Sequence, residues 1–324
     1  MATAGVTWRT WAEVLTERAG ELEQLAIARD EGTLRPEDLF VPTGLRDWDR
    51  NGGVPRGVLT VVGAVDGQGK SLVAGHLAHA ASSAGLEVAQ FVFEDPERAS
   101  ADRSLAAATG MDSRDLAMVK FRTDDLDRVF AAARGAGDWG ARVHYHAGLL
   151  TPDQVFEAIK DIQATLRARG RRIGLVLVDY AQAFDDEGKG LESVIRHMAW
   201  RANKAAQALD CGFVVFSQVK PEINARGQGV FFAAQKKDPN AWDVSGYMPG
   251  PGTQDLQWSS AFGQRGRCVA YVFRPGHYER MLGMPGAKDD RIVFRFAKVN
   301  FGKAFTFTAR FDGPTGRIFD GPGA

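Results

Sequence analysis

The sequence contains few cysteines, and their positions do not indicate a disulfide framework or a metal site. Only two of the 324 residues are cysteine, Cys211 and Cys268, and each lies at the edge of an apolar run, outside the spacings typical of metal ligands. We therefore expect two reduced thiols in a hydrophobic core, in a protein of the cytoplasm.

The sequence also lacks an excess of charge and a long hydrophobic run. Lys plus Arg and Asp plus Glu each number 40, so the formal net charge is 0. Such a chain is not drawn non-specifically to nucleic acid or anionic lipid, and any polyanion site must be local. No apolar run reaches about 18 residues, and no basic N-terminal segment precedes a hydrophobic one. Neither a membrane span nor a signal peptide is predicted.

The most informative segment is 59–72, an apolar run followed by a glycine-bearing loop that ends in Gly69-Lys70-Ser71. Backbone N–H groups of such a loop bind nucleotide phosphates, and glycines let the main chain approach them closely. Lys70 would reach the β- and γ-phosphates, and the Ser71 hydroxyl would bind Mg²⁺. The pattern G-x-x-x-x-G-K-[ST] has Ala64 in place of its first glycine, a mild departure. The predicted ATP-binding residues are Ala64, Val65, Asp66, Gly67, Gln68, Gly69, Lys70, Ser71 and Leu72.

Strand-like and helix-like segments alternate on both sides of this loop. Buried strands that alternate with helices predict an α/β fold with a mostly parallel sheet flanked by helices. The last third contains three strand-like runs with no helix expected between them, which indicates an antiparallel extension. The expected strands are 58–63, 88–94, 142–146, 173–180, 212–218, 269–274, 291–298 and 304–311, and the expected helices are 8–30, 72–83, 98–108, 152–169 and 191–209.

Three predicted strands end on polar side chains that suit phosphoryl transfer, Glu94, Asp179 and Gln218. In an open parallel sheet the carboxyl ends of the strands form the functional edge. Asp179 would hold Mg²⁺, Glu94 would orient and deprotonate the attacking water, and Gln218 would sense the γ-phosphate. The alternative is that these residues are polar only because strands end at solvent.

Several motifs in one order resemble the RecA-like motor domain of DnaB-type replicative DNA helicases. The resemblance covers about residues 41–320 and implies a RecA-like P-loop NTPase core, six subunits in a ring, ATP between neighbours and single-stranded DNA in the pore. The segments that carry it are 42–49, Gly52-Gly53, the phosphate loop, 91–94, 178–182, 216–218, 255–261, 273–278 and 298–302.

The resemblance also implies a domain organisation. Residues 1–40 would form a linker helix and connector that docks on the adjacent subunit, and residues 41–324 would form the motor. The family's N-terminal collar, which recruits primase, has no counterpart in this sequence. We expect a minimal motor of phage or plasmid type, with a primase or a loader as a possible partner.

One family position departs from the pattern. The family carries a Lys-x-Arg pair that acts on the neighbouring subunit's ATP, and the matching residues here are Lys298 and Asn300. An arginine finger contributes roughly 10³-fold or more in rate. Either Lys303, Arg295 or another base substitutes for it, or hydrolysis is slow.

By resemblance Arg274 would lie beside the adenine; otherwise it is a strand-end residue in a turn.

The family's DNA contacts lie in two loops, and here the first, 185–190, is acidic. The second, 219–254, combines basic residues with aromatic ones, which suits a single strand. The alternative is a flexible surface loop whose aromatic residues pack on a neighbouring subunit. The predicted DNA contacts in this loop are Lys220, Arg226, Lys236 and Lys237.

The sequence therefore predicts an ATP hydrolase that acts as a DNA helicase in replication. Lys70, Ser71, Glu94, Asp179 and Gln218 would act in cis, and Lys298 would act on the neighbour. Two other functions remain open: a RecA-like recombination mediator that does not unwind DNA, and an interaction protein whose assembly is regulated by ATP.

Overall fold

The computed structural model describes residues 9–181, 184, 188, 190–220, 222–223, 255–256, 260–281, 283, 288, 290–299 and 302–321. The chain divides into two compact units, Met1–Leu39 and Phe40–Ala324. The first unit contains α1 (Trp11–Asp30) and α2 (Pro36–Leu39). A capping box begins α1, because the Thr10 hydroxyl accepts from the Glu13 backbone N–H and the Glu13 carboxylate accepts from the Thr10 N–H. None of the residues of α1 is buried.

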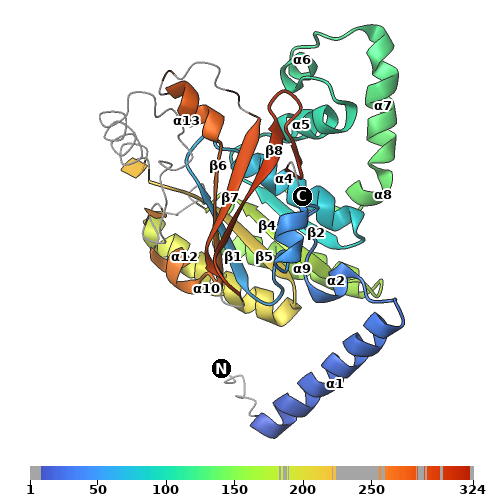
Figure 1. Ribbon diagram of the computed structural model, residues 1–324, viewed down its shortest axis with the longest axis vertical. Helices are drawn as coiled ribbons and strands as arrows, with labels where there is room; N and C mark the ends of the chain where they lie inside the picture. Colours follow the sequence, from blue (N-terminus) through green and yellow to red (C-terminus); the bar gives the residue numbers. More distant parts are fainter. Residues whose placement is uncertain are drawn as a thin grey trace. The chain divides into compact units, whose positions relative to one another are not determined.

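One sheet organises the second unit (Figure 1). Among the described residues it has nine strands in the order β3-β2-β4-β5-β1-β6-β7-β8-β9. The strands from β3 to β6 in this order are parallel, and β7, β8 and β9 are antiparallel additions. The strands are β1 (Leu59–Ala64), β2 (Glu87–Val92), β3 (Val143–Ala147), β4 (Ile173–Asp179), β5 (Gly212–Gln218), β6 (Cys268–Phe273), β7 (Arg291–Val299), β8 (Phe305–Asp312) and β9 (Arg317–Phe319).

Helices cover both faces of this sheet, which explains why its central strands are buried along their whole length. On one face the core includes Phe156 of α9, Met198 of α10 and Phe262 of α12. On the other face it includes Leu77 of α4 and Phe294 of β7. The helices of this unit are α3 (Arg46–Arg50), α4 (Lys70–Ser83), α5 (Glu97–Thr109), α6 (Ser113–Ala117), η1 (Thr123–Asp125), α7 (Leu126–Gly135), α8 (Gly137–Gly140), α9 (Pro152–Arg167), α10 (Leu191–Leu209), α12 (Ser260–Arg265) and α13 (Pro275–Met281).

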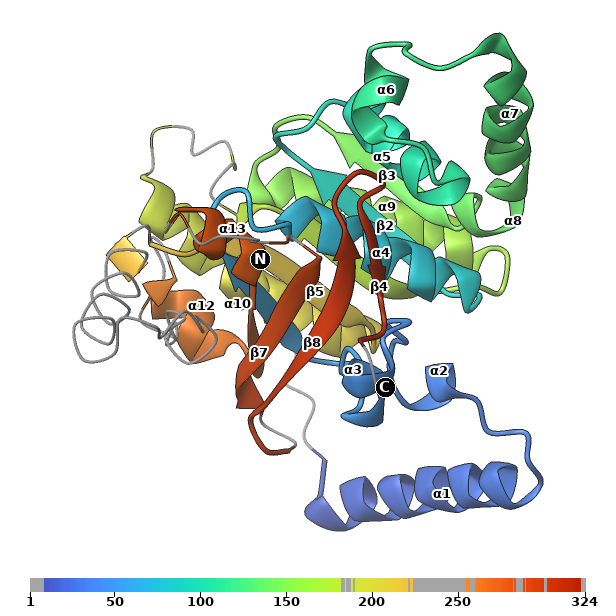
Figure 2. The same cartoon turned by 45° about the horizontal axis from the view of Figure 1, so that its top comes forward.

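The expected α/β class is confirmed, with a mostly parallel sheet and an antiparallel C-terminal extension. Each expected strand and helix is present, with its ends shifted by a few residues. The expectation of no helix between the last strand-like runs was wrong, because α13 lies between β6 and β7. The short helices α6 to α8 and the short strand β9 were not expected. In Figure 2, α5 to α8 gather beside the β3 end of the sheet.

The two cysteines are buried and free, as expected of core thiols. Burial raises the pKa of both Cys211 and Cys268 to about 12, so neither is a thiolate near neutral pH. Within the described residues, no helix is long and apolar enough to cross a membrane.

Candidate active site

The predicted phosphate loop joins a fully buried strand to a helix. β1 ends at Ala64 and α4 begins at Lys70, with Gly69 as its N-cap residue. Gly67 and Gly69 have positive φ values of 72° and 101°, which a residue with a side chain rarely adopts. Ala64 is instead the last residue of β1, and its carbonyl accepts a hydrogen bond from the Val219 N–H at 3.0 Å. Its extended conformation explains why this position accepts alanine.

Lys70 points back over the loop that precedes it. Its side chain is 8% exposed, and its ammonium lies 3.2 Å from Asp66 Oδ1 and 3.4 Å from the Ala64 carbonyl oxygen. The Gln218 amide donates to the same Asp66 oxygen at 2.7 Å. This contact follows from the sheet, because Ala64 of β1 is paired with Gln218 of β5. Asp66 therefore connects the predicted phosphate-binding lysine to the predicted γ-phosphate sensor.

Asp179 ends β4 in a buried position close to the start of α4. Its pKa is raised to about 6, chiefly because burial removes water from the carboxylate. A hydrogen bond with Ser71 and the positive charge of Lys70 act in the opposite direction. Among the described residues, Oδ1 of Asp179 has no hydrogen-bond partner. A buried, unpartnered carboxylate oxygen beside a hydroxyl suits a hard cation such as Mg²⁺, so Ser71 and Asp179 fit the metal that this fold implies.

Glu94 lies in the short turn between β2 and α5, at the same edge of the sheet. Val92 is paired with Asp179, and the Phe93 N–H donates to the Asp179 carbonyl at 2.9 Å, so the turn starts beside the predicted metal ligand. Glu94 itself is exposed. The pKa of Tyr180 is raised, first by burial and then by the negative charge of Glu94, as expected if the carboxylate lies near Asp179.

An ion pair fixes the turn that carries Glu94. The Arg103 guanidinium on α5 donates to Asp95 at 2.7 Å and to the Ser100 hydroxyl at 3.2 Å. The Tyr145 hydroxyl of β3 donates to the same Ser100 oxygen at 2.9 Å. The neighbour of Glu94 is thus connected to both α5 and β3.

A cavity of about 1260 Å³ opens beside Asp179. Ser71, Asp179, Arg103 and Tyr145 are among the residues that line it. His76 of α4 also lines this space, and burial lowers its pKa to about 4. The active-site edge is therefore open on the side of the predicted metal ligands.

Arg274, predicted to lie beside the adenine, follows β6 and contacts the phosphate loop. Its backbone N–H donates to Gln68 Oε1 at 2.7 Å, and its guanidinium donates to the Gly67 carbonyl at 3.1 Å. The guanidinium also lies 4.7 Å from the centroid of the Phe311 ring. Arg274 is therefore part of the loop's surroundings rather than an isolated strand-end residue.

Lys298, predicted to act on the neighbour, lies at the opposite edge of the sheet. It is paired with Val269 near the start of β6, and β6 begins beside the start of β1. Its ammonium donates to the carbonyls of Gly263 and Gln264, at 3.1 and 3.3 Å, at the end of α12. Val269 is in turn paired with Val61, three residues or about 10 Å before the end of β1, so Lys298 is set back from its own phosphate loop.

The two candidate substitutes for the finger arginine lie at different levels of β7 and β8. Arg295 is paired with Tyr271, which is itself paired with Gly63 near the end of β1. Lys303 is exposed and precedes β8, on the side where β7 ends after Lys298. Lys303 thus shares an edge with Lys298, whereas Arg295 does not. Asn300 lies outside the described residues.

Of the predicted DNA contacts, only Lys220 lies within the described residues. It is exposed, and its backbone N–H donates to the Asp255 carbonyl at 2.9 Å. Val219 forms an antiparallel bridge with Leu256, so the two ends of the segment 221–254 are held together. Arg226, Lys236 and Lys237 lie outside the described residues, as does most of the segment 185–190.

A family model described as the DnaB-like helicase C-terminal domain matches residues 41–244. The chain belongs to the DnaB-like helicase family. No curated protein sequence matches it.

Two solved structures share the fold of this DnaB-like chain. A DnaB-like replicative helicase, described together with its interactions with primase, is 17% identical with a TM-score of 0.74, over 98% of this chain and 68% of that one. A second structure, described as an ATPase domain, is 18% identical with a TM-score of 0.75, over 97% of this chain and 99% of that one. At these identities the likeness shows the fold, which is that of a RecA-like DnaB ATPase domain.

Sequence reasoning missed two features of this DnaB-like site. It placed Asp66 only as one member of the phosphate loop, whereas the carboxylate contacts both Lys70 and Gln218. It also missed the pair of Asp95 and Arg103, which are eight residues apart. An acidic residue directly after the predicted base, with an arginine two turns into the next helix, was the available signal.

Proposed function

We propose that this chain is the ATP-dependent motor of a ring-shaped DNA helicase that acts in replication. The observation that carries the proposal is the meeting of Lys70, Ser71, Glu94, Asp179 and Gln218 at the carboxyl edge of one parallel sheet, in a member of the DnaB-like family. Catalysis of phosphoryl transfer depends mostly on positioning and charge stabilisation, and these side chains supply both.

In cis, each of these residues has one task. The loop N–H groups and Lys70 bind the phosphates of ATP, and Ser71 and Asp179 hold Mg²⁺. The metal, when bound, neutralises charge on phosphate oxygens. Glu94, exposed and held near Asp179 by the turn after β2, orients a water molecule and accepts its proton. Gln218 exchanges its contact with Asp66 for the terminal phosphate, and so distinguishes ATP from ADP.

Positive charge from a second subunit completes this site. Lys298 and Lys303 lie at the edge opposite the phosphate loop of their own chain, so they serve hydrolysis only by reaching a neighbour's nucleotide. A repeated head-to-tail contact of this kind closes into a ring, and we expect six subunits from the family. In this proposal residues 1–40 link neighbours, residues 41–324 form the motor, and single-stranded DNA passes the segments 185–190 and 219–254. Primase or a loader is the expected protein partner.

A combined measurement of mass and ATP turnover tests this function. We expect a hexamer whose turnover rises with single-stranded DNA and falls on dilution below the assembly concentration. We expect Lys70→Ala to lose turnover because the phosphates lose their cation. Glu94→Gln should still bind ATP and assemble, but hydrolyse it at least 100-fold more slowly, the lower end of what a positioned general base contributes (about 10²–10⁴-fold).

A forked duplex separates the remaining functions. A helicase displaces one strand of the fork when ATP is hydrolysed. Turnover that rises with single-stranded DNA but leaves the fork intact would indicate a recombination-mediator activity instead. A chain that stays monomeric with a non-hydrolysable ATP analogue and an oligonucleotide would contradict the proposal as a whole.

A further inference from the structure

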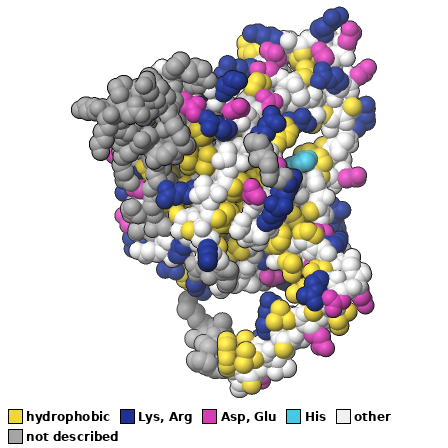
Figure 3. All heavy atoms as spheres, viewed as in Figure 1, with side chains coloured by type: hydrophobic (Ala, Val, Ile, Leu, Met, Phe, Trp, Pro, Cys, Tyr) yellow, Lys and Arg dark blue, Asp and Glu magenta, His cyan; other side chains and the backbone are white. Residues whose placement is uncertain are grey.

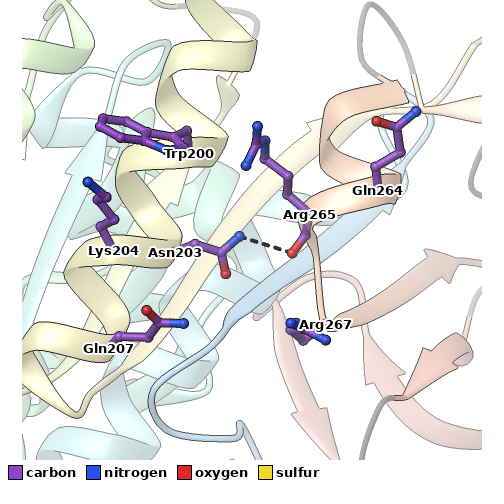
Figure 4. A pocket seen from close by; sticks show the side chains of 7 residues that line it. All are labelled: Trp200, Asn203, Lys204, Gln207, Gln264, Arg265 and Arg267. Carbon is purple, nitrogen blue, oxygen red and sulfur yellow. Dashed lines mark hydrogen bonds between the residues drawn. The ribbon is translucent and has the colours of Figure 1, made fainter. Parts of the chain in front are cut away.

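A second pocket lies between α10 and α12, beside the start of β6 (Figure 4). Its volume is about 450 Å³. One face of α10 contributes four side chains at the three- and four-residue spacing of a helix, and the end of α12 faces them. Its lining includes Trp200, Asn203, Lys204, Arg265 and Arg267.

The pocket is separate from the ATP site. The Arg267 N–H, at its rim, donates to the Leu59 carbonyl at 2.9 Å, which places the pocket where β1 begins. The phosphate loop follows the other end of β1. α10 itself begins at Leu191, directly after the segment 185–190 that the family uses for DNA contact. The helix therefore leads from a predicted DNA loop to the pocket.

Two cations in the pocket have no carboxylate partner within the described part of the chain, Lys204 and Arg265. Elsewhere on α10 the basic residues are paired: Arg196 donates to Glu192 at 2.8 Å, and Arg201 contacts Asp153. The described residues that line the pocket include no Asp or Glu. In Figure 3, by contrast, basic and acidic side chains are interspersed over α5 to α8. The pocket is thus a local concentration of positive charge on a chain whose net charge is 0.

An aromatic ring adjoins these cations. The Trp200 side chain belongs to a residue that is 42% exposed, and the Lys204 ammonium lies 4.1 Å from its ring centroid. Figure 4 shows the Arg265 side chain extending from the end of α12 toward the Trp200 side of the pocket. The Asn203 amide donates to the Arg265 carbonyl at 3.0 Å and so connects α10 to the end of α12. The ring of Trp200 and the charges of Lys204 and Arg265 are therefore held together by side chains from both α10 and α12.

Cations without a carboxylate partner among the described residues, beside a partly exposed aromatic ring, suit a single-stranded nucleic acid, because the charges bind phosphates and the ring stacks on a base. We propose that this pocket binds a phosphodiester of single-stranded DNA through Lys204 and Arg265, with a base against the exposed part of Trp200. The inference rests on the proposed function, since it extends the DNA path beyond the loops. It assigns a strand contact to the edge of the sheet opposite the ATP site.

Binding of a fluorescent oligothymidylate to the full chain, with a non-hydrolysable ATP analogue and at several salt concentrations, tests this site. Because each neutralised phosphate on a single strand contributes about 0.7 to the slope of log K against log salt, and both cations bind one phosphodiester, the double variant Lys204→Gln/Arg265→Gln should lower the magnitude of that slope by about 0.7. We expect Trp200→Leu to weaken binding roughly tenfold without changing the slope. Arg196→Gln, on the same helix but ion-paired, is the control and should bind as the wild type does.

Ultraviolet cross-linking to the same oligonucleotide gives an independent readout. Trypsin releases residues 197–201 as one peptide that contains Trp200, and we expect this peptide to carry the cross-linked nucleotide. Wild-type affinity and salt slope in both variants, with no such cross-link, would overturn this inference alone. Failure of the wild-type chain to bind the oligonucleotide would overturn the DNA-binding part of the proposed function as well. Variants that change only the mass of the assembly would show that the pocket is a contact between subunits instead.

Discussion

Replacing Asp66 with alanine tests whether the phosphates of ATP compete with a carboxylate for the P-loop lysine. Asp66 Oδ1 accepts from Lys70 at 3.2 Å and from Gln218 at 2.7 Å. These two side chains are the ones expected to face the terminal phosphates. A bound triphosphate must therefore break both contacts before it gains its own. We expect Asp66→Ala to bind ATP more tightly than the wild type.

The size of this gain follows from the exposure of the two contacts. The Lys70 side chain is 8% exposed but that of Asp66 is 76% exposed, so water weakens the ion pair to about 0.2–1 kcal/mol. The Gln218 hydrogen bond contributes about 0.5–1.5 kcal/mol. Together these values correspond to roughly 3-fold to 70-fold in affinity. Asp66→Asn removes the charge but retains an acceptor for Gln218. Its gain in ATP affinity should therefore be smaller than that of Asp66→Ala.

Equilibrium titration with a fluorescent ATP analogue measures this difference. The gain should shrink as salt is raised, because ions screen an exposed pair. Asp161→Ala removes an exposed carboxylate from α9, away from the loop, and should leave ATP affinity unchanged. Equal or weaker ATP binding by Asp66→Ala would refute the reasoning, since the carboxylate would then support the nucleotide rather than compete with it.

Three further predictions concern residues in and around the candidate active site. Gly69→Ala should lower the free energy of unfolding by about 1–3 kcal/mol, because its φ is 101° although the nearest atom to an added Cβ is 3.7 Å away; thermal melting measures this loss. Arg103→Ala should lower kcat roughly tenfold with little change in ATP affinity, because it releases the turn that carries Glu94; Arg98→Ala, on the exposed side of α5, is the control. Burial lowers the pKa of His76 from 6.5 to about 4, so the unfolded chain binds more protons in this range and stability is lost as pH falls from 6.5 to 4. The loss should reach about 3 kcal/mol in urea unfolding and be absent in His76→Gln.

The sequence predicted the core of the fold because its central strands are buried on both faces. Such strands appear as continuous apolar runs, and the runs that became β4 and β5 end in Asp179 and Gln218 at the residues where the strands end. The parallel arrangement then brings these ends to one edge. The position of the candidate site therefore needed only the strand boundaries and their direction.

Short elements without a strong hydrophobic period could not be predicted in the same way. α13 begins with Pro275 and spans seven residues in a turn-like stretch, and β9 has three residues. α7 is a different case, because Leu126, Val129, Phe130 and Ala133 have the three- and four-residue spacing of an amphipathic helix, a signal that the prediction missed. The contacts of Asp66 also stayed hidden, because they depend on the loop's path between β1 and α4 rather than on the residues that identify the motif.

The position of Lys298 bears on how much of the proposed hydrolytic site one chain can hold. Its ammonium is anchored to the carbonyls that end α12, at the edge where β1 begins, and Lys303 follows on the same side. Lys70, Asp179 and Glu94 lie at the edge where β1 ends. Lys298 is level with Val61, three residues or about 10 Å before the end of β1, and its ammonium is held by the carbonyls that end α12. We therefore expect Lys298, if it contributes to hydrolysis, to act on a neighbour's ATP, and the turnover of each chain to depend on assembly.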